Sequence, residues 1–201
     1  MLDRKSSLRR HIRETLANYS AEQLLLASSL IVDRLLAMPP VAAANTIMIW
    51  FPLPGEVDLS SLADWLWQRP APKGAGRLAL PRVDWTARTI TPVIVNNLST
   101  DCVPGRYSLR EPKADLDSLA LDDLDVVVVP GLAFDVGGFR LGRGGGFYDR
   151  LLAQLSELPA DRRAQTIGVC LDEQVINRVP REAHDLRVDM MVTPTRTIVC
   201  V

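Results

Sequence analysis

The chain has 201 residues, of which 47% are hydrophobic and 23% are charged, and its formal net charge is −1 at pH 7. This length and composition fit one globular domain with a sizeable core, so residues 1–201 are expected to form a single domain. The near-zero charge gives no long-range attraction to nucleic acid or acidic membranes, and no apolar stretch reaches the roughly 20 residues that a membrane span needs.

The first third of the chain predicts helices followed by a buried strand. Residues 4–38 show two helical patterns, the second opened by a capping box at Ser20 and stopped by the prolines at 39–40. Residues 46–51 predict a buried strand, and Asp58 is expected to cap a short helix. The opening residues are too charged for a secretory signal, so a cytoplasmic protein is expected.

Strands and irregular segments alternate over the remaining sequence. Residues 96–124 are rich in Pro, Asp and Ser and are expected to form loop with at most one short helix. The other predicted elements are a loop at 70–76, strands at 77–80, 89–95, 125–129, 166–171, 188–192 and 197–201, and a helix at 147–155. Strands interleaved with helices predict an α/β fold whose mainly parallel sheet is covered on both faces.

A segment between Val129 and Phe147 contains seven of the twelve glycines, together with Arg140 and Arg143. It is not a P-loop, because no Gly-Lys pair exists, and a G-x-G-x-x-G pattern starting at Gly142 would need glycine at position 147. Glycines allow close backbone approach, arginines neutralise charge, and a helix N-terminus attracts anions. A distinct phosphate-binding loop is therefore predicted, with a flexible surface loop and an RGG-type RNA-binding segment as alternatives.

Four other residues have both a chemical and a purely structural interpretation. Asp149 lies in the first turn of a predicted helix, where a carboxylate either complements the helix dipole or binds Mg²⁺ beside phosphates. Glu56 follows a strand end, where α/β proteins bind ligands, or is a solvated turn residue. Lys5 and Arg9 are one helical turn apart and can simply form an exposed basic face.

Several chemistries find no support in the sequence. No Ser or Cys has the setting of a catalytic nucleophile such as G-x-S-x-G. His184 beside Asp185 is interpreted as a surface pair. The three cysteines are too widely spaced to indicate a disulfide framework or a zinc site, and they are expected to be buried: Cys102, Cys170 and Cys200.

Taken together, these residues resemble the 5-formyltetrahydrofolate cyclo-ligase family, also called 5,10-methenyltetrahydrofolate synthetase. The most specific match is PGLAFD at 130–135 running into RLGRGGGFYD at 140–149. Weaker matches follow the family's order over almost the whole chain: KSSLR at 5–9, PGE at 54–56, LPR at 80–82, VPGR at 103–106, and His184-Asp185 with Asp189.

The resemblance implies an ATP- and Mg²⁺-dependent ring closure. ATP would phosphorylate the formyl oxygen of 5-formyltetrahydrofolate, N10 would attack the formyl carbon, and loss of phosphate would leave 5,10-methenyltetrahydrofolate. The resemblance also implies a three-layer fold similar to the sugar-phosphate isomerase and coenzyme-A transferase group. We expect a monomer that binds ATP and a reduced folate, and neither nucleic acid nor membrane.

Site residues follow from the same resemblance. Arg143 and Lys5 would be catalytic, Phe51 and Glu56 would bind the folate, and Asp149 with Asp185 would ligate magnesium. The sequence departs from the family at Gly145, where some members carry lysine, and at Phe147, where tyrosine is frequent. The residues implied to hold ATP are Lys5, Ser6, Ser7, Leu8, Arg9, Arg140, Leu141, Gly142, Arg143, Gly144, Gly145, Gly146, Phe147 and Tyr148.

Two other functions remain as hypotheses. A sugar-phosphate isomerase-like or transferase-like enzyme would use the glycine and arginine loop for a substrate phosphate. A non-catalytic binder would hold nucleotide or RNA through GRGGGF at 142–147. Phosphoryl transfer needs positioning and charge neutralisation more than a protein nucleophile, and the arginines, amides and carboxylates of this chain favour it.

Overall fold

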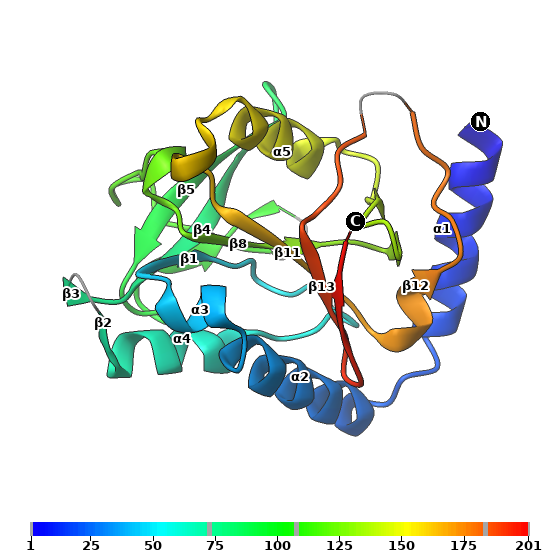
Figure 1. Cartoon of the computed structure of the whole chain (residues 1–201), viewed down its shortest axis with the longest axis horizontal. Helices are drawn as coiled ribbons and strands as arrows, with labels where there is room; N and C mark the ends of the chain where they lie inside the picture. The colour runs from blue at the N-terminus through cyan, green and yellow to red at the C-terminus, as the bar shows by residue number, and fades with distance from the viewer. Residues whose placement is uncertain (1, 72–73, 107–108, 183–184, 201) are drawn as a thin grey trace.

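The computed structural model describes residues 2–71, 74–106, 109–182 and 185–200. At its centre lies a seven-stranded sheet with the strand order β14-β13-β11-β8-β1-β4-β5 (Figure 1). The strands are β1 (Thr46–Met48), β4 (Arg77–Asp84), β5 (Thr89–Val95), β8 (Val126–Pro130), β11 (Gln165–Val169), β13 (Met190–Val192) and β14 (Thr197–Val199). Strands β13, β11, β8, β1 and β4 pair in parallel, and an antiparallel strand closes each edge. The predicted mainly parallel sheet is confirmed.

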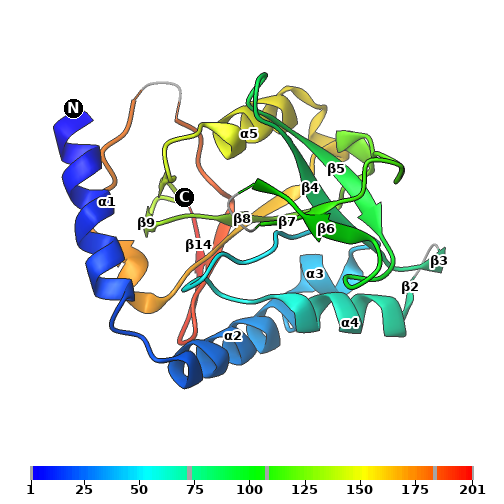
Figure 2. The same ribbon diagram turned by 180° about the vertical axis from the view of Figure 1, so that it is seen from behind.

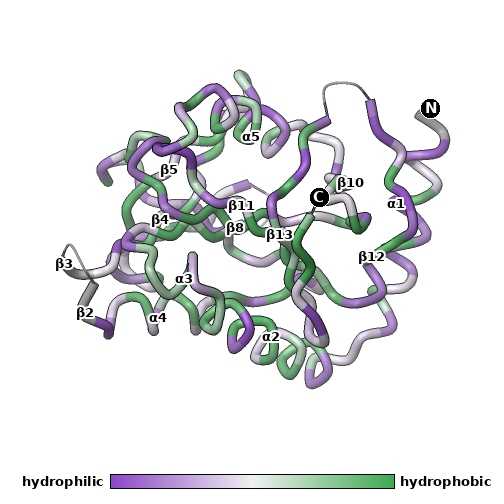
Figure 3. The backbone as a smooth tube through the Cα atoms, viewed as in Figure 1, coloured by the Kyte–Doolittle hydropathy of each residue, from purple (hydrophilic) through white to green (hydrophobic). Residues whose placement is uncertain are grey.

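Helices cover both faces of this sheet and give three layers (Figure 1). One face carries α2 (Ala21–Leu36), α3 (Pro39–Ala43) and α4 (Ser60–Gln68), and the other carries α5 (Phe147–Glu157). The valines of β8 explain this arrangement, because successive side chains of a strand point to opposite faces. Val126 and Val128 join the core that contains α2 and α4, whereas Val127 and Val129 join the core that contains α5. Figure 3 shows this central strand as a hydrophobic stretch of the chain.

Helix α1 (Leu2–Leu16) stands apart from these layers, at one side of the molecule (Figures 1 and 2). It packs on a small sheet of β10 (Arg140–Leu141), β9 (Ala133–Asp135) and β12 (Val175–Ile176), in that order. Ile12 is buried in a third core cluster with Leu141 and Val179. This packing places α1 at the carboxyl edge of the parallel strands, where α/β proteins bind ligands.

The two longest segments predicted as loop contain short strands. Segment 96–124 includes an antiparallel pair, β6 (Cys102–Pro104) and β7 (Arg110–Pro112), as well as a 3₁₀ turn at Leu121–Asp123. The glycine-rich segment begins with the β9–β10 hairpin, so Arg140 and Leu141 lie in a strand. The loop prediction was wrong for both because strands of two or three residues carry too little alternation to show a period.

Smaller corrections concern element ends. The prolines at 39–40 do not stop α2, which ends at Leu36; they open α3, where proline suits the first helical positions. Asp58 accepts a hydrogen bond from Ser60 N at 2.9 Å, but the N-cap position of α4 is Leu59. The loop predicted at 70–76 carries β2 (Pro70–Ala71) paired with β3 (Gly74–Ala75), while positions 72–73 and the predicted strand end at 201 lie outside the described residues.

Two further features of the structure concern the cysteines and possible membrane spans. The cysteines at 102, 170 and 200 are buried and free, as expected, and burial raises the pKa of each thiol. Within the described ranges, no helix is both long enough and apolar enough to cross a bilayer.

The capping box that opens α2 has the predicted form. Ser20 Oγ accepts from Gln23 N at 3.2 Å, and Gln23 Oε1 accepts from Ser20 N at 2.8 Å. We expect Ser20→Ala to lower the free energy of unfolding by about 1 kcal/mol, since it leaves a helix N–H without its partner. Urea denaturation would measure this, with Ser29→Ala on the exposed side of the same helix as control. Equal stability of the two variants would contradict a capping role.

Candidate active site

The phosphate loop was predicted over residues 140–146, and its glycine-rich part, Gly142–Gly146, leads directly into α5. Gly144 (φ +109°) and Gly146 (φ +73°) have the left-handed backbone that favours glycine, and Gly146 is the N-cap of α5. Arg9 Nε donates to the Gly142 carbonyl at 2.9 Å, so α1 holds the start of the loop. Because the segment is ordered between a strand and a helix, it differs from the disordered tracts in which RGG motifs bind RNA. Its amides and the α5 N-terminus offer donors to an anion.

Lys5 lies on the same side of α1 as Arg9 and is paired with carboxylates. Its Nζ lies 3.0 Å from Asp185 Oδ2 and 3.6 Å from Glu182 Oε1. Asp185 Oδ2 also accepts from Glu182 N at 2.8 Å. The structure therefore brings together a basic residue and a predicted magnesium ligand that are 180 positions apart. His184, which the sequence places beside this carboxylate, lies outside the described residues.

Arg143 reaches across to the loop that follows β1. Its Nε and Nη2 both donate to Glu56 Oε1, at 3.0 and 2.6 Å, and Glu56 Oε2 accepts from Leu53 N at 3.0 Å. The Arg143 side chain is 44% exposed and that of Glu56 is 21% exposed. Burial raises the pKa of the nearby Tyr148 phenol and the Glu56 charge raises it further, so this hydroxyl stays protonated. One ion pair thus links the predicted folate and ATP residues.

Arg140 is buried, although it was predicted to lie in a loop that binds ATP. Its side chain is 2% exposed, and its Nη2 donates to Asp149 Oδ1 at 2.8 Å. Burial lowers the pKa of this guanidinium, and the charges of Asp149, Tyr148 and Asp185 partly offset that effect. Its Nε and Nη1 have no hydrogen-bond partner within the described part of the chain. Arg140 therefore lies beneath the loop, close to both predicted magnesium ligands.

The carboxylates of Asp149 and Asp185 suit Mg²⁺, which needs few protein ligands, better than they suit a metal that is bound only by protein side chains. Asp149 is 42% exposed and Asp185 is 16% exposed, and the charges of both act on Arg140. No group of three or more His, Cys, Asp or Glu side chains that could hold a metal occurs among the described residues. Mg²⁺ typically takes one or two carboxylates and completes its shell with phosphates and water. Asp149 in the first turn of α5 and Asp185 beside Lys5 would match that requirement if the predicted loop holds phosphates.

An aromatic side chain from the β4–β5 turn contacts Phe147, the residue after the loop. Phe147 meets Trp85 edge to face, with ring centroids 5.2 Å apart at 78°. The Arg106 guanidinium lies 5.4 Å from the Trp85 ring, and that of Arg110 lies 5.2 Å from Phe51. Sequence reasoning missed Trp85, although a large aromatic residue in the turn between two predicted strands was a usable signal. Flat half-buried rings beside arginines suit an aromatic ligand.

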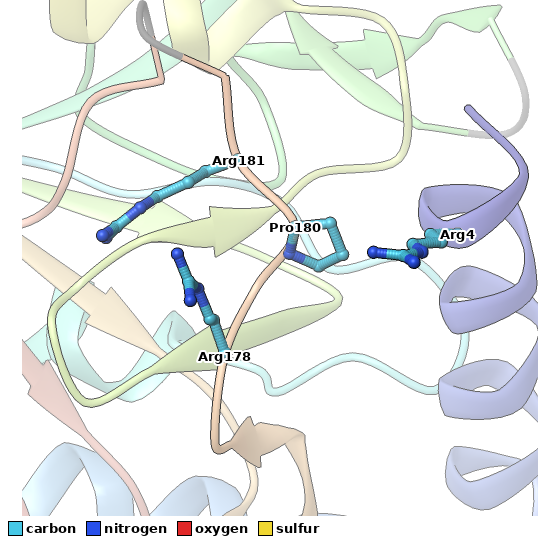
Figure 4. Close-up of a pocket in the computed structure, with 4 residues that line it drawn as sticks. All are labelled: Arg4, Arg178, Pro180 and Arg181. Carbon is cyan, nitrogen blue, oxygen red and sulfur yellow. The ribbon is translucent and has the colours of Figure 1, made fainter. Parts of the chain in front are cut away.

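A pocket of about 620 Å³ lies between α1 and the segment after β12. Figure 4 shows Arg4 projecting from α1 toward Pro180, with Arg178 and Arg181 on the facing segment. A second hollow of about 450 Å³ shares Arg4 and extends along α1 past Ser7, Leu8 and His11. These arginines gave no signal in the sequence because arginine is common throughout this chain.

Some predicted ATP residues offer only backbone to a ligand. Leu8 packs against the core cluster beneath α1, and Leu141 is 1% exposed within it. The two departures from the family pattern are neighbours in space, since a Cβ at Gly145 would lie 2.6 Å from the Phe147 ring. A side chain at position 145 would therefore require that ring to move.

The chain is similar to known proteins over most of its length. The family model for the 5-formyltetrahydrofolate cyclo-ligase family matches residues 2–194. The 5-formyltetrahydrofolate cyclo-ligase of Escherichia coli K12 is 33% identical over 171 residues, which cover 81% of this chain and 85% of that protein. The NMR structure of Aquifex aeolicus 5,10-methenyltetrahydrofolate synthetase superposes with a TM-score of 0.81 at 30% identity, covering 98% of this chain and 92% of that one.

A second solved structure supports the fold alone. The 5,10-methenyltetrahydrofolate synthetase of Mycoplasma pneumoniae has a TM-score of 0.72 at 20% identity, covering 94% of this chain and 98% of that one. Since the family model spans nearly the whole chain and the E. coli relative exceeds 30% identity over most of it, the chain belongs to the 5-formyltetrahydrofolate cyclo-ligase family, a family of ligases.

Proposed function

We propose that this protein converts 5-formyltetrahydrofolate to 5,10-methenyltetrahydrofolate at the expense of ATP, releasing ADP and phosphate. The observation that supports the ATP-dependent part is a glycine loop at the N-terminus of α5 that carries Arg143. Its Gly142 carbonyl accepts a hydrogen bond from Arg9, and Lys5 lies one helical turn from Arg9 on α1. Such a site combines guanidinium and ammonium charges with backbone donors, which phosphoryl transfer needs.

In this proposal the chain positions the two substrates and neutralises phosphate charge. Segments 5–9 and 140–148 hold ATP, with Lys5 and Arg143 stabilising the charge that develops on the transferring phosphoryl group. Asp149 and Asp185 hold Mg²⁺, which supplies further neutralisation of the phosphates when bound. Arg140 lies beneath the loop and orients Asp149 through their 2.8 Å bond.

The folate lies on the other side of Arg143. Glu56 accepts a hydrogen bond from the folate, and Phe51 lines the folate pocket with an aromatic ring. The formyl oxygen takes the γ-phosphoryl group of ATP and ADP leaves. N10 then attacks the formyl carbon, the C–O bond to phosphate breaks, and N10 loses its proton. No protein nucleophile is required, in keeping with the residues gathered here.

The proposal also covers the domain organisation, oligomeric state, location and partners of the protein. Residues 1–201 act as one catalytic domain, as a monomer in the cytoplasm, on two small-molecule substrates. The net charge of −1 supports the absence of a nucleic-acid partner.

An absorbance assay tests this function. Purified protein with ATP, Mg²⁺ and 5-formyltetrahydrofolate should produce the near-ultraviolet absorbance of the methenyl product, and a non-hydrolysable ATP analogue should not support it. No ATP-dependent signal would favour a sugar-phosphate isomerase-like or transferase-like activity instead.

A further inference from the structure

The ion pair between Glu56 and Arg143 joins the two proposed substrate sites. Glu56 belongs to the proposed folate site and Arg143 to the proposed phosphate loop, and the two are 87 positions apart. Both donors of the Arg143 fork, Nε and Nη2, point at the single oxygen Oε1 of Glu56. While Arg143 is held in this way, the same fork is not available to a phosphate oxygen.

The Glu56 carboxylate is heavily engaged as well. Its Oε1 accepts two N–H groups from Arg143, and its Oε2 accepts one from Leu53 N. An sp² oxygen offers about two lone pairs, so Oε1 has none to spare for a folate donor. A folate donor directed at Oε1 therefore competes with Arg143, as a phosphate competes with Glu56 for Arg143, whereas Oε2 keeps one lone pair beside its bond from Leu53 N.

Breaking the ion pair between Arg143 and Glu56 costs little free energy at this place in the fold. The Arg143 side chain is 44% exposed, and partly exposed ion pairs contribute little net stability. Arg143 is flanked by Gly142 and Gly144, and a Cβ at Gly142 would meet nothing within 4 Å. The guanidinium can therefore turn from the carboxylate toward the N-terminus of α5 without disturbing the core.

We propose that Glu56 is a positioning residue that couples the two substrate sites through Arg143. Without substrates, Glu56 holds Arg143 away from the phosphates; folate bound at Glu56 releases Arg143 to the nucleotide. This inference rests on the proposed function. Because coupling between sites is reciprocal, nucleotide bound at Arg143 frees Glu56 for the folate by the same factor.

Calorimetric titration with Mg²⁺ and a non-hydrolysable ATP analogue tests the coupling. We expect the wild type to bind the analogue about fivefold or more tightly when 5-formyltetrahydrofolate is present. We expect Glu56→Gln, which removes the charge and keeps the size, to bind the analogue more tightly than the free wild type. Added folate should then change that affinity little.

The direction of the change separates this role from a structural one. A merely structural Glu56 predicts weaker analogue binding in Glu56→Gln, because the loop would be disordered. Glu157→Gln, at the exposed C-terminal end of α5, makes the same chemical change away from the site and should behave as wild type.

Two results would overturn the inference and leave the proposed function standing: analogue affinity in the wild type that does not depend on folate, or weaker analogue binding by Glu56→Gln than by the free wild type. Failure of the wild type to bind the analogue at all would instead reject the proposed function, and the coupling with it.

Discussion

Arg143→Ala is expected to lower kcat by about one to three orders of magnitude while the protein remains folded. The substitution removes a guanidinium proposed to act on the transferring phosphoryl group, and loss of one preorganised donor typically costs that much. Stability should change little, because Arg143 is 44% exposed and its partner Glu56 can be solvated at 21% exposure. The effect therefore belongs to the chemical step rather than to folding.

Steady-state rates at saturating ATP and folate measure this effect. Arg13→Ala provides the control, since Arg13 is an exposed arginine in the last turn of α1. Circular dichroism and the thermal midpoint should match the wild type in both variants. An unchanged rate for Arg143→Ala at saturating ATP would remove the glycine loop from the mechanism.

Asp149→Asn should raise the Mg²⁺ concentration needed for half-maximal activity by about tenfold or more, since even outer-shell partners of a metal contribute roughly 10- to 100-fold to its affinity. Asparagine retains an oxygen that can accept the 2.8 Å bond from Arg140, so the loop should keep its place. The variant loses the carboxylate charge that partly offsets the burial of Arg140. A modest loss of stability is therefore expected alongside the change in magnesium requirement.

Rates measured over a range of Mg²⁺ concentrations give the magnesium requirement, and thermal unfolding gives the change in stability. Asp161→Asn, at an exposed position of the 3₁₀ turn after α5, is the matched control. If Asp149→Asn changes thermal stability alone, Asp149 serves the dipole of α5 and the Arg140 pair, and the magnesium assignment is wrong.

Elements with a clear period or a clear breaker could be predicted from the sequence. The apolar run of β8 and the Ser20 capping box both depend on neighbours in the sequence, and both have the expected form. Strands β9, β10 and β12 could not be predicted, because each has only two or three residues, and β12 also depends on pairing with the distant β9. Arg140, expected in a loop, lies in the β9–β10 hairpin and is buried.

The candidate site shows a similar division. The glycine loop could be recognised locally, since its chemistry lies within a few consecutive residues. The resemblance to a family placed Lys5, Glu56 and Asp185 in the same site, but no sequence pattern shows that Glu56 would pair with Arg143. Trp85 was missed because its contact with Phe147 depends on where the β4–β5 turn comes to lie.

A crystal structure with Mg²⁺ and a non-hydrolysable ATP analogue tests the central claim most directly. We expect phosphate oxygens within hydrogen-bond distance of the Gly142–Gly146 amides, with Lys5 and Arg9 beside them and the metal on Asp149 and Asp185. A nucleotide bound elsewhere, with this loop facing solvent and Arg143 still on Glu56, would contradict it.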